Sequence, residues 1–231
     1  MLKINLNQNQ KTHYLIFDFD GVIADSLDSM AYGMKRAWPQ FRFFPTRFIK
    51  KIIVDFVNKP VHSREQNVTE QVTATIIKDY QRIAKVLIAQ GRTKVFEGFV
   101  AEIREFLKLN NCKLAIVSSG SEIYINDIMH TVDLPFEYIY GAETSLSKEI
   151  KVEMVCQNWQ IDLSQCMYFT DSKTDVIELN RILKLKQIIG CIWGWQGHKK
   201  LREVLPENQI LKEFVDFRKV VLETELQVKS V

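Results

Sequence analysis

Two aspartates at the end of an apolar run are the residues whose type and spacing most clearly indicate chemistry. Asp18 and Asp20 follow the run 14–17 and are followed at once by Gly21. Side chains at positions i and i+2 of an extended chain share a face, so we expect both carboxylates to point into one cavity. Two like charges this close are unfavourable unless a cation lies between them or one carboxyl is protonated. A solvated acidic turn is the alternative, but apolar residues on both sides argue against it.

Hydroxyl groups and a glycine follow a second apolar run. Residues 113–117 are followed by Ser118, Ser119 and Gly120, directly before a helical pattern. The N-terminus of a helix presents backbone N–H groups and a positive dipole, which together favour an anion. Serine is also a common N-cap residue, so this segment alone supports either an anion site or an ordinary cap.

Two further aspartates follow a third apolar run, 166–169. Asp171 lies just beyond this run and Asp175 lies four residues later. Alone, Asp171 could be a helix cap. Beside Asp18 and Asp20, however, it completes a cluster of hard oxygen ligands of the kind that Mg²⁺ takes.

These polar residues all follow compact apolar runs without alternation, which is typical of strands buried in a parallel sheet. Helical patterns separate the later runs, so the sequence predicts an α/β fold with a Rossmann-like, doubly wound parallel sheet. Ligands of such folds bind at the carboxyl ends of the strands. The expected strands are 14–17, 113–117, 166–169 and 188–192, and the expected helices are 123–131, 149–159, 175–185 and 218–222.

Residues 25–92 have a different pattern, with no convincing strand. Amphipathic helical patterns cover 29–38, 46–57 and 70–90, and Gly91 fits a helix C-cap. We therefore expect a helical cap domain, residues 25–92, inserted into an α/β core domain. The core would consist of residues 1–24 and 93–231.

Composition and charge argue against several classes of protein. The chain has 231 residues, of which 46% are hydrophobic, and a net charge of +3. Its basic runs are short and interrupted, so we expect no nucleic-acid partner. No apolar stretch reaches the roughly 20 residues of a membrane span, and the N-terminus lacks the apolar core of a signal peptide. We therefore expect a cytoplasmic protein with no membrane partner.

In this order, the motifs resemble those of the haloacid dehalogenase superfamily. They fit its phosphoglycolate phosphatase-like and β-phosphoglucomutase-like branch, which carries a helical cap. Residues 18–26 match the first motif, D-x-D-G-x-x-x-D-S. Ser118 matches the second motif, and Asp171 with Asp175 matches the fourth.

The third motif of the superfamily is a lysine, for which the chain has two candidates. Lys148 stands 23 residues before Asp171, a spacing that suits the expected helix and strand. Lys151 is the competitor, and it could equally be a solvated helix residue. We favour Lys148.

The resemblance implies a phosphoric monoester hydrolase that works through an aspartyl-phosphate intermediate. Asp18 would be the nucleophile. Asp20 would protonate the leaving alkoxide and then accept a proton from the hydrolytic water. Ser118 would bind the phosphoryl oxygens, and the backbone amides of Ser119 and Gly120 would assist in substrate binding.

The resemblance also implies Mg²⁺ as the cofactor. The metal site would include Asp18, Asp20 through its backbone carbonyl, and Asp171. Asp175 would support this site by holding Lys148 or a metal-bound water. Lys148 would place positive charge near the phosphoryl group and orient Asp18.

Two positions bear on the reaction class and the substrate. Superfamily phosphomutases typically carry a histidine ten residues after the second aspartate, where this chain has Met30. Residues 63–65 nevertheless resemble a mutase cap loop, in which Arg64 would bind an anionic substrate group; a surface arginine is the alternative. We expect a small phosphorylated metabolite, such as phosphoglycolate or a sugar phosphate. A phosphomutase and a catalytically silent binding module are the alternatives.

Overall fold

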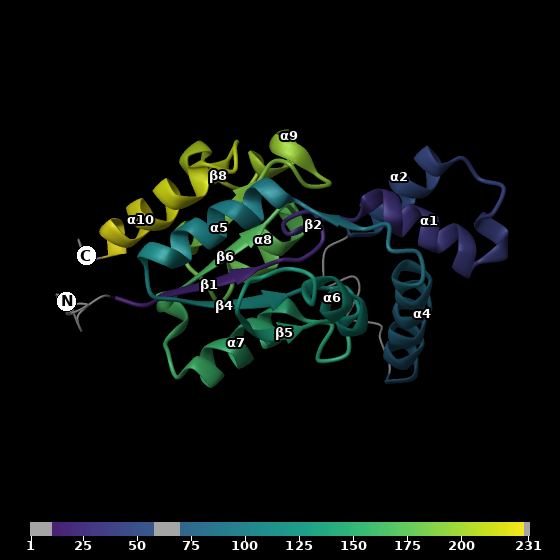
Figure 1. Ribbon diagram of the computed structural model, residues 1–231, viewed down its shortest axis with the longest axis horizontal. Coiled ribbons are helices and arrows are strands. Elements are labelled where there is room, and N and C mark those ends of the chain that lie inside the picture. Colours follow the sequence, from purple (N-terminus) through teal and green to yellow (C-terminus); the bar gives the residue numbers. More distant parts are fainter. Residues whose placement is uncertain (1–10, 58–69, 229–231) are drawn as a thin grey trace, which may run out of the picture.

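The fold is built on a six-stranded sheet in which every strand runs parallel to its neighbours (Figure 1). The structure is a computed structural model that describes residues 11–57 and 70–228. The order β5-β4-β1-β6-β7-β8 places β1 in the interior of the sheet, and the expected α/β fold class is confirmed. The strands are β1 His13–Phe17, β4 Cys112–Val117, β5 Phe136–Tyr140, β6 Cys166–Thr170, β7 Ile188–Cys191 and β8 Ile210–Leu211.

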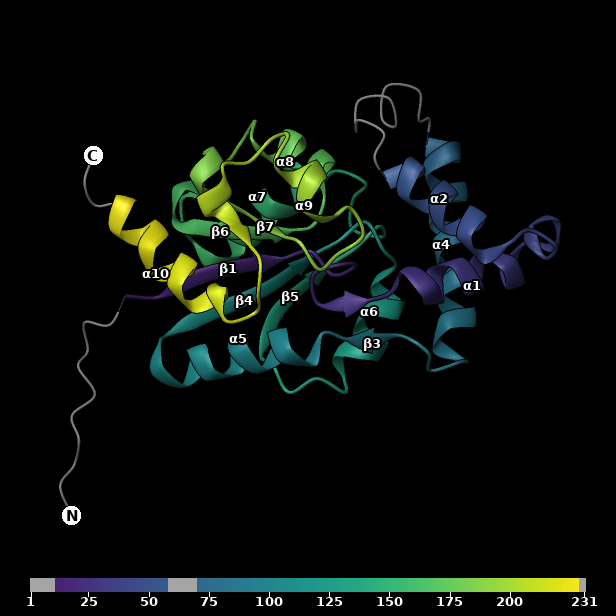
Figure 2. The same cartoon turned by 90° about the horizontal axis from the view of Figure 1, so that it is seen from above.

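Helices cover both faces of this sheet (Figure 2). Alternate side chains of β1 point to opposite faces, so Leu15 and Phe17 belong to one core cluster and Ile16 to the other. Burial on both faces explains why the central strands are continuous apolar runs. The α-helices of the core are α5 Glu97–Leu109, α6 Glu122–Met129, α7 Lys148–Trp159, α8 Lys173–Leu179, α9 Gly197–Leu201 and α10 Asp216–Val228, with 3-10 turns η2 Leu163–Gln165, η3 Leu185–Gln187 and η4 Glu207–Gln209.

An aromatic cluster holds α5 and α10 against one face of the sheet. Phe217 of α10 packs its ring within 5.4–6.2 Å of the rings of four other phenylalanines. All of them are buried, and aromatic pairs at these distances stabilise beyond the area they bury. The four partners are Phe17, Phe99, Phe106 and Phe169.

The register of the central strands brings their carboxyl ends together. Phe17 is paired with Ile116 of β4 on one side and with Phe169 of β6 on the other. The backbone N–H of Asp18 also donates to the carbonyl of Phe169 at 2.9 Å. The residues that follow β1, β4 and β6 therefore lie at one edge of the sheet.

The described residues between β2 and β3 are helical and lie together at one end of the sheet (Figures 1 and 2). Helix α1 packs against both α2 and α4. A side chain at Gly33 of α1 would have its Cβ 2.9 Å from Leu87 of α4, so this glycine permits the close helix crossing. We call α1, α2 and α4 the cap helices. The segments are β2 Ala24–Asp25, α1 Leu27–Ala37, η1 Pro39–Phe41, α2 Thr46–Val57, α4 Glu70–Ile88 and β3 Lys94–Val95.

The sequence-based expectations missed several elements. Strand β5 was not expected because it lies at the sheet edge and is only partly buried, which hides the apolar run of a central strand. Strands β2, β3 and β8 have two residues each, too few to show a pattern. The expected helix 175–185 is wrong in its second half, because α8 ends at Leu179. There the N–H groups of Ile182 and Leu183 both donate to the Leu179 carbonyl, and the chain turns.

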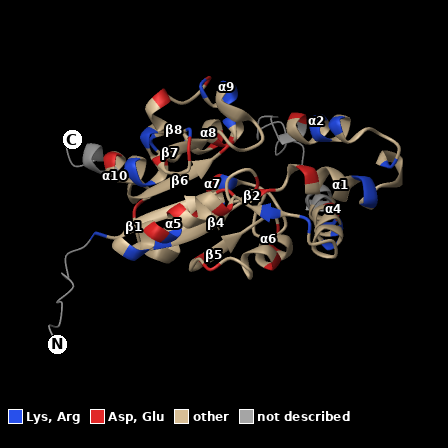
Figure 3. Ribbon diagram, turned by 45° about the horizontal axis from the view of Figure 1, so that its top comes forward, with Lys and Arg blue, Asp and Glu red and all other residues tan. Residues whose placement is uncertain are grey.

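The surface carries charges of both signs. Lysine and arginine are interspersed with aspartate and glutamate over the outer helices (Figure 3). Within residues 11–57 and 70–228, no helix combines the length and the apolar character that crossing a bilayer requires.

The aromatic cluster predicts a large stability effect at Phe217. Replacing Phe217→Ala should lower the free energy of unfolding by about 3–5 kcal/mol, because it leaves a cavity among four rings. Urea unfolding measures this change. Leu222→Ala on an exposed face of the same helix is the matched control and should change stability by less than about 1 kcal/mol. Equal effects of the two substitutions would contradict the packing described here.

Candidate active site

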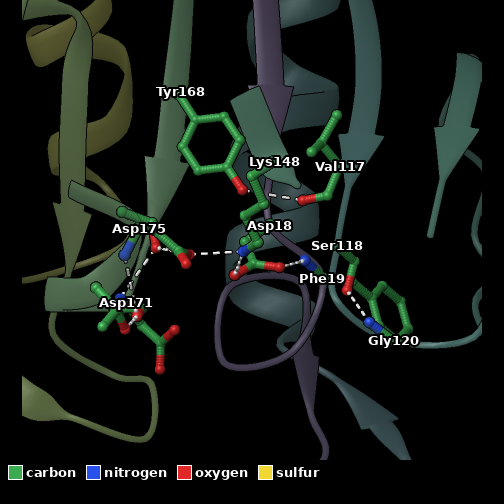
Figure 4. Close-up of polar contacts among 12 residues, drawn as sticks. Asp18, Phe19, Val117, Ser118, Gly120, Lys148, Tyr168, Asp171 and Asp175 are labelled. Carbon is green, nitrogen blue, oxygen red and sulfur yellow. Dashed lines mark hydrogen bonds and ion pairs between the residues drawn. The ribbon is translucent and has the colours of Figure 1, made fainter. Parts of the chain in front are cut away.

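Asp18 stands at the end of β1, where the chain enters a tight turn (Figure 4). Asp20 follows within this turn. Asp18 is buried, and its Oδ1 accepts a hydrogen bond of 2.7 Å from the N–H of Phe19. Gly21 adopts φ +78°, a conformation that residues with a Cβ rarely take. Its N–H donates to the carbonyl of Ala24 at 2.8 Å and closes the turn.

Asp171, after β6, packs directly against this turn. A Cβ on Gly21 would collide with the carboxylate of Asp171, so the glycine is needed for the approach as well as for its φ angle. The N–H of Trp195 donates to Oδ2 of Asp171 at 2.5 Å. The carboxylate is thereby held between the β1 loop and the segment after β7.

Lys148, the first residue of α7, reaches two of the carboxylates. Its Nζ lies 2.6 Å from Oδ2 of Asp18 and 2.6 Å from Oδ2 of Asp175, and its side chain is only 3% exposed (Figure 4). The backbone N–H of Lys148 donates to Oε1 of Glu178 at 2.8 Å, which fixes the start of the helix. Burial alone would lower the pKa of Lys148. The charges of Asp175 and Asp18 outweigh burial, so its pKa lies well above the ordinary value.

Asp175, in the first turn of α8, holds this lysine in place. Its Oδ2 also accepts a hydrogen bond of 2.7 Å from the hydroxyl of Thr170. Burial acts to raise the pKa of Asp175, but the charge and hydrogen bond of Lys148 bring it below the ordinary value. Asp175 is therefore the ionised partner of Lys148.

The segment after β4 adds a hydroxyl and backbone amides. Ser118 is buried, and its Oγ accepts a hydrogen bond of 3.0 Å from the N–H of Gly120. Ser119 and Gly120 also line the cavity described below. This segment lies beside Asp18 because β4 pairs with β1.

Lys151, also on α7, holds the backbone of the segment that follows β4. Its Nζ donates to the carbonyls of Ser118 at 2.5 Å and Gly141 at 3.2 Å. The alternative of a solvated helix residue is wrong, because Lys151 has 0% relative exposure. Burial and the nearby charge of Lys148 lower the pKa of Lys151 to about 7. Thus Lys148 contacts carboxylates, whereas Lys151 contacts backbone carbonyls.

Asp18, Asp20 and Asp171 have too few positively charged partners to compensate their negative charge. Burial raises the pKa of Asp20 to about 6 and that of Asp171 to about 7. Burial also raises the pKa of Asp18 well above its ordinary value, although the charge of Lys148 acts in the opposite direction. Oδ1 of Asp20 is buried and has no hydrogen-bond partner among the described residues. A further cation would relieve this imbalance.

These residues fit a magnesium ion, as judged by their chemistry. Carboxylate and carbonyl oxygens are the ligands that Mg²⁺ prefers, and it usually keeps several waters and takes one or two carboxylates. In the described ranges, no three acidic, histidine or cysteine side chains come close enough to hold an ion by themselves. Asp18 and Asp171 with the backbone carbonyl of Asp20 could hold the ion together with water and substrate oxygens.

The four aspartates, Lys148 and residues 118–120 face one cavity of about 360 Å³ between the sheet edge and the cap helices. Met30 lies in its wall. Arg64, assigned to substrate binding from the sequence, lies outside the described residues. The predicted site residues that line the cavity are Asp18, Asp20, Ser118, Ser119, Gly120, Lys148, Asp171 and Asp175.

Three contributors to the site were missed from the sequence. Glu178 anchors the N-terminus of α7, and the spacing of three residues from Asp175 on a helix could have indicated it. Lys151 was considered only as a rival of Lys148, although residues three apart share a helix face. The contact of the Trp195 amide with Asp171 comes from a loop, and no sequence signal specifies it.

The raised pKa of Asp171 predicts a pH-dependent stability effect. An unfolded aspartate titrates near 3.9, so the folded protein holds this proton more tightly. Stability that is present below about pH 4 is lost as the pH rises to about 7. Asp171→Asn removes this loss and should stabilise the metal-free protein by up to about 4 kcal/mol at pH 7.5.

The same substitution should have little effect near pH 4, and urea unfolding in a chelating buffer measures both points. Asp127→Asn on the exposed face of α6 is the matched control, with no expected gain. A gain for Asp171→Asn that does not depend on pH would contradict the assignment of this effect to burial.

Solved structures of similar fold come from several bacteria. A predicted phosphatase from Clostridium acetobutylicum has a TM-score of 0.68 at 19% identity, with 91% of this chain and 98% of that chain covered. A haloacid dehalogenase-like family hydrolase from Streptococcus pneumoniae has a TM-score of 0.67 at 16% identity, with coverages of 89% and 96%. A predicted phosphoglycolate phosphatase from Haemophilus somnus has a TM-score of 0.64 at 15% identity, with coverages of 90% and 97%. These similarities show the fold.

The family assignment comes from the sequence itself. A search of curated proteins gave no significant match. The sequence model of the haloacid dehalogenase-like hydrolases, however, matches residues 15–180, which is more than half of the chain and includes the eight predicted site residues that line the cavity. The resemblance inferred from the motifs is thereby confirmed, and the chain belongs to the haloacid dehalogenase-like hydrolase family.

Proposed function

We propose that this protein is a magnesium-dependent phosphatase that hydrolyses a small phosphomonoester through an aspartyl-phosphate intermediate. The observation that carries the proposal is the buried carboxylate of Asp18 in the cavity. One of its oxygens accepts from the Phe19 amide, and the other accepts from Lys148. These contacts fix the carboxylate in one orientation, as a nucleophile requires.

In the first step, a carboxylate oxygen of Asp18 forms a bond to phosphorus, and the bond between phosphorus and the ester oxygen breaks. The leaving alkoxide takes a proton from Asp20. The pKa of Asp20, raised by burial to about 6, keeps a protonated fraction available near neutral pH.

In the second step, water attacks the phosphorus of the aspartyl phosphate and transfers a proton to the carboxylate of Asp20. The bond between phosphorus and Asp18 breaks, inorganic phosphate leaves, and Asp20 is again protonated. The same residue serves as acid and then as base, so the proton count closes over the cycle.

Hydrogen-bond donors of the protein would stabilise the negative charge on the phosphoryl group. The hydroxyl of Ser118 and the backbone amide of Ser119 lie at the cavity edge next to Asp18. Lys148 supplies positive charge from the other side, anchored by Asp175. Fixed donors of this kind stabilise transition-state charge without reorganisation.

Asp18 and Asp171, with the backbone carbonyl of Asp20, would hold the magnesium ion. When bound, the ion neutralises charge between the phosphoryl oxygens and the carboxylates. The support for this part of the proposal is the deficit of positive charge around Asp18, Asp20 and Asp171.

Met30 favours hydrolysis over phosphoryl transfer between two positions of a sugar. This apolar side chain lies in the cavity wall at the position where mutases of the superfamily typically carry a histidine. A catalytically silent module is disfavoured because Asp18, Asp20 and Lys148 all face the cavity.

A turnover assay tests the proposal. The wild-type protein with p-nitrophenyl phosphate and Mg²⁺ should release phosphate, and Asp18→Asn should lose about 10⁴-fold or more in kcat, because the nucleophile is removed. Asp127→Asn, the same chemical change on the surface of α6, should retain activity. No turnover of any phosphorylated metabolite by the wild type would favour the binding module, and isomerised product without free phosphate would indicate a mutase.

Metal binding should be measurable without turnover. If Mg²⁺ binds the folded protein, then a concentration of 100 times its dissociation constant should stabilise the protein by about 2.7 kcal/mol. Thermal unfolding with and without Mg²⁺ measures this shift. The shift should be strongly reduced in Asp171→Asn and retained in Asp127→Asn. An identical shift in both variants would rule out Asp171 as a ligand.

A further inference from the structure

The cavity has two walls of opposite character. The wall at the sheet edge carries the aspartates, the serines and Lys148 described above. The opposite wall is formed by the cap helices and consists mainly of apolar side chains. These are Met30, Met34, Trp38, Ile52, Ile53 and Ile83.

Charge within the cavity is unfavourable for a substrate with a second anionic group. Among the described residues that line it, Lys148 is the one lysine or arginine, and its ammonium already contacts Asp18 and Asp175. The charged residue on the cap side is Asp79, which is itself acidic. A carboxylate on the substrate would therefore meet like charge without a counter-ion in this part of the chain.

Away from the sheet edge, the described polar residues that line the cavity are Asp79, Tyr80, Ser172, Trp195 and Gln196. Gln196 and Ser172 line the cavity but hydrogen bond to each other at 3.1 Å, and Gln196 also accepts from the N–H of Lys173. Hydroxyls that face the methionine and isoleucine side chains of the cap wall would lose water without gaining hydrogen bonds there, which is unfavourable. An apolar body in the same place gains from burial.

We infer that the substrate is a phosphomonoester whose alcohol part is apolar, rather than phosphoglycolate or a sugar phosphate. This inference rests on the proposed function and concerns its substrate class. The cavity of about 360 Å³ leaves room for a ring-sized alcohol beside the phosphoryl group.

Two pairs of primary-alcohol monoesters test the inference. Cyclohexylmethyl phosphate keeps the ring size of glucose 6-phosphate without its hydroxyls, and propyl phosphate replaces the carboxylate of phosphoglycolate by an ethyl group. In each pair, kcat/KM should be about 100-fold or more higher for the apolar member. Because the leaving groups are all primary alkoxides, the ratio reports mainly on the cap wall.

Variants of the cap wall should shift this preference. Met34→Arg on α1 introduces a cation and should raise kcat/KM for phosphoglycolate relative to propyl phosphate by about tenfold or more. Asp79→Asn on α4 removes the acidic group and should move the same ratio in the same direction, which keeps the test decisive if the arginine variant does not fold. Leu222→Arg, at an exposed position of α10 remote from the cavity, should leave the ratio unchanged.

The outcomes separate the substrate class from the proposed function. One result is turnover of p-nitrophenyl phosphate together with a kcat/KM for phosphoglycolate or glucose 6-phosphate that equals or exceeds that for the apolar member of the pair. This result would overturn the inference about the substrate and leave the proposed function standing. A ratio that neither cap variant shifts also overturns the inference about the substrate. Failure to turn over any of the five monoesters, with folded protein and Mg²⁺ present, overturns the proposed function and the inference with it.

Discussion

Lys148 donates from one ammonium group to two carboxylates, Asp18 and Asp175, at 2.6 Å each, in a place shielded from water. Removing Lys148 would leave two buried carboxylates without their shared counter-ion, which is strongly unfavourable. The fold secures this arrangement from three directions. Asp18 follows the interior strand β1, Lys148 begins α7, and Asp175 lies in the first turn of α8. Glu178 and Thr170 then fix the start of α7 and the carboxylate of Asp175.

The need to compensate buried negative charge also accounts for the local architecture around the site. Four aspartates at one sheet edge repel one another, so each needs its own source of compensation. Asp175 has Lys148 and Thr170, and Asp171 has the amide of Trp195. Asp20 has a buried oxygen without a partner among the described residues. Stability is thus traded for a concentration of carboxylates at the sheet edge, as the proposed function requires, and such a trade is common where function opposes folding.

The location of the site could be predicted from the sequence. Asp18, Ser118 and Asp171 each follow an expected strand, and the carboxyl ends of neighbouring parallel strands lie at the same edge of the sheet. Spacing favoured Lys148 over Lys151 but did not give Lys151 its role, since both lie on one face of α7 and only the packing of that helix separates them. Strand β5 was hidden by its partial exposure at the sheet edge. The apolar cap wall was also hidden, because amphipathic helices show which face is buried but not whether it lines a core or a cavity.

The central claim is that Asp18 becomes covalently phosphorylated. Borohydride reduces an acyl phosphate to an alcohol, so it should convert a trapped aspartyl phosphate to homoserine. The most direct measurement is peptide mass spectrometry of protein quenched during turnover of a phosphomonoester with Mg²⁺ and then reduced. We predict homoserine at position 18 and at no other aspartate. Continued release of phosphate with unmodified Asp18, or homoserine at another position, would contradict this account.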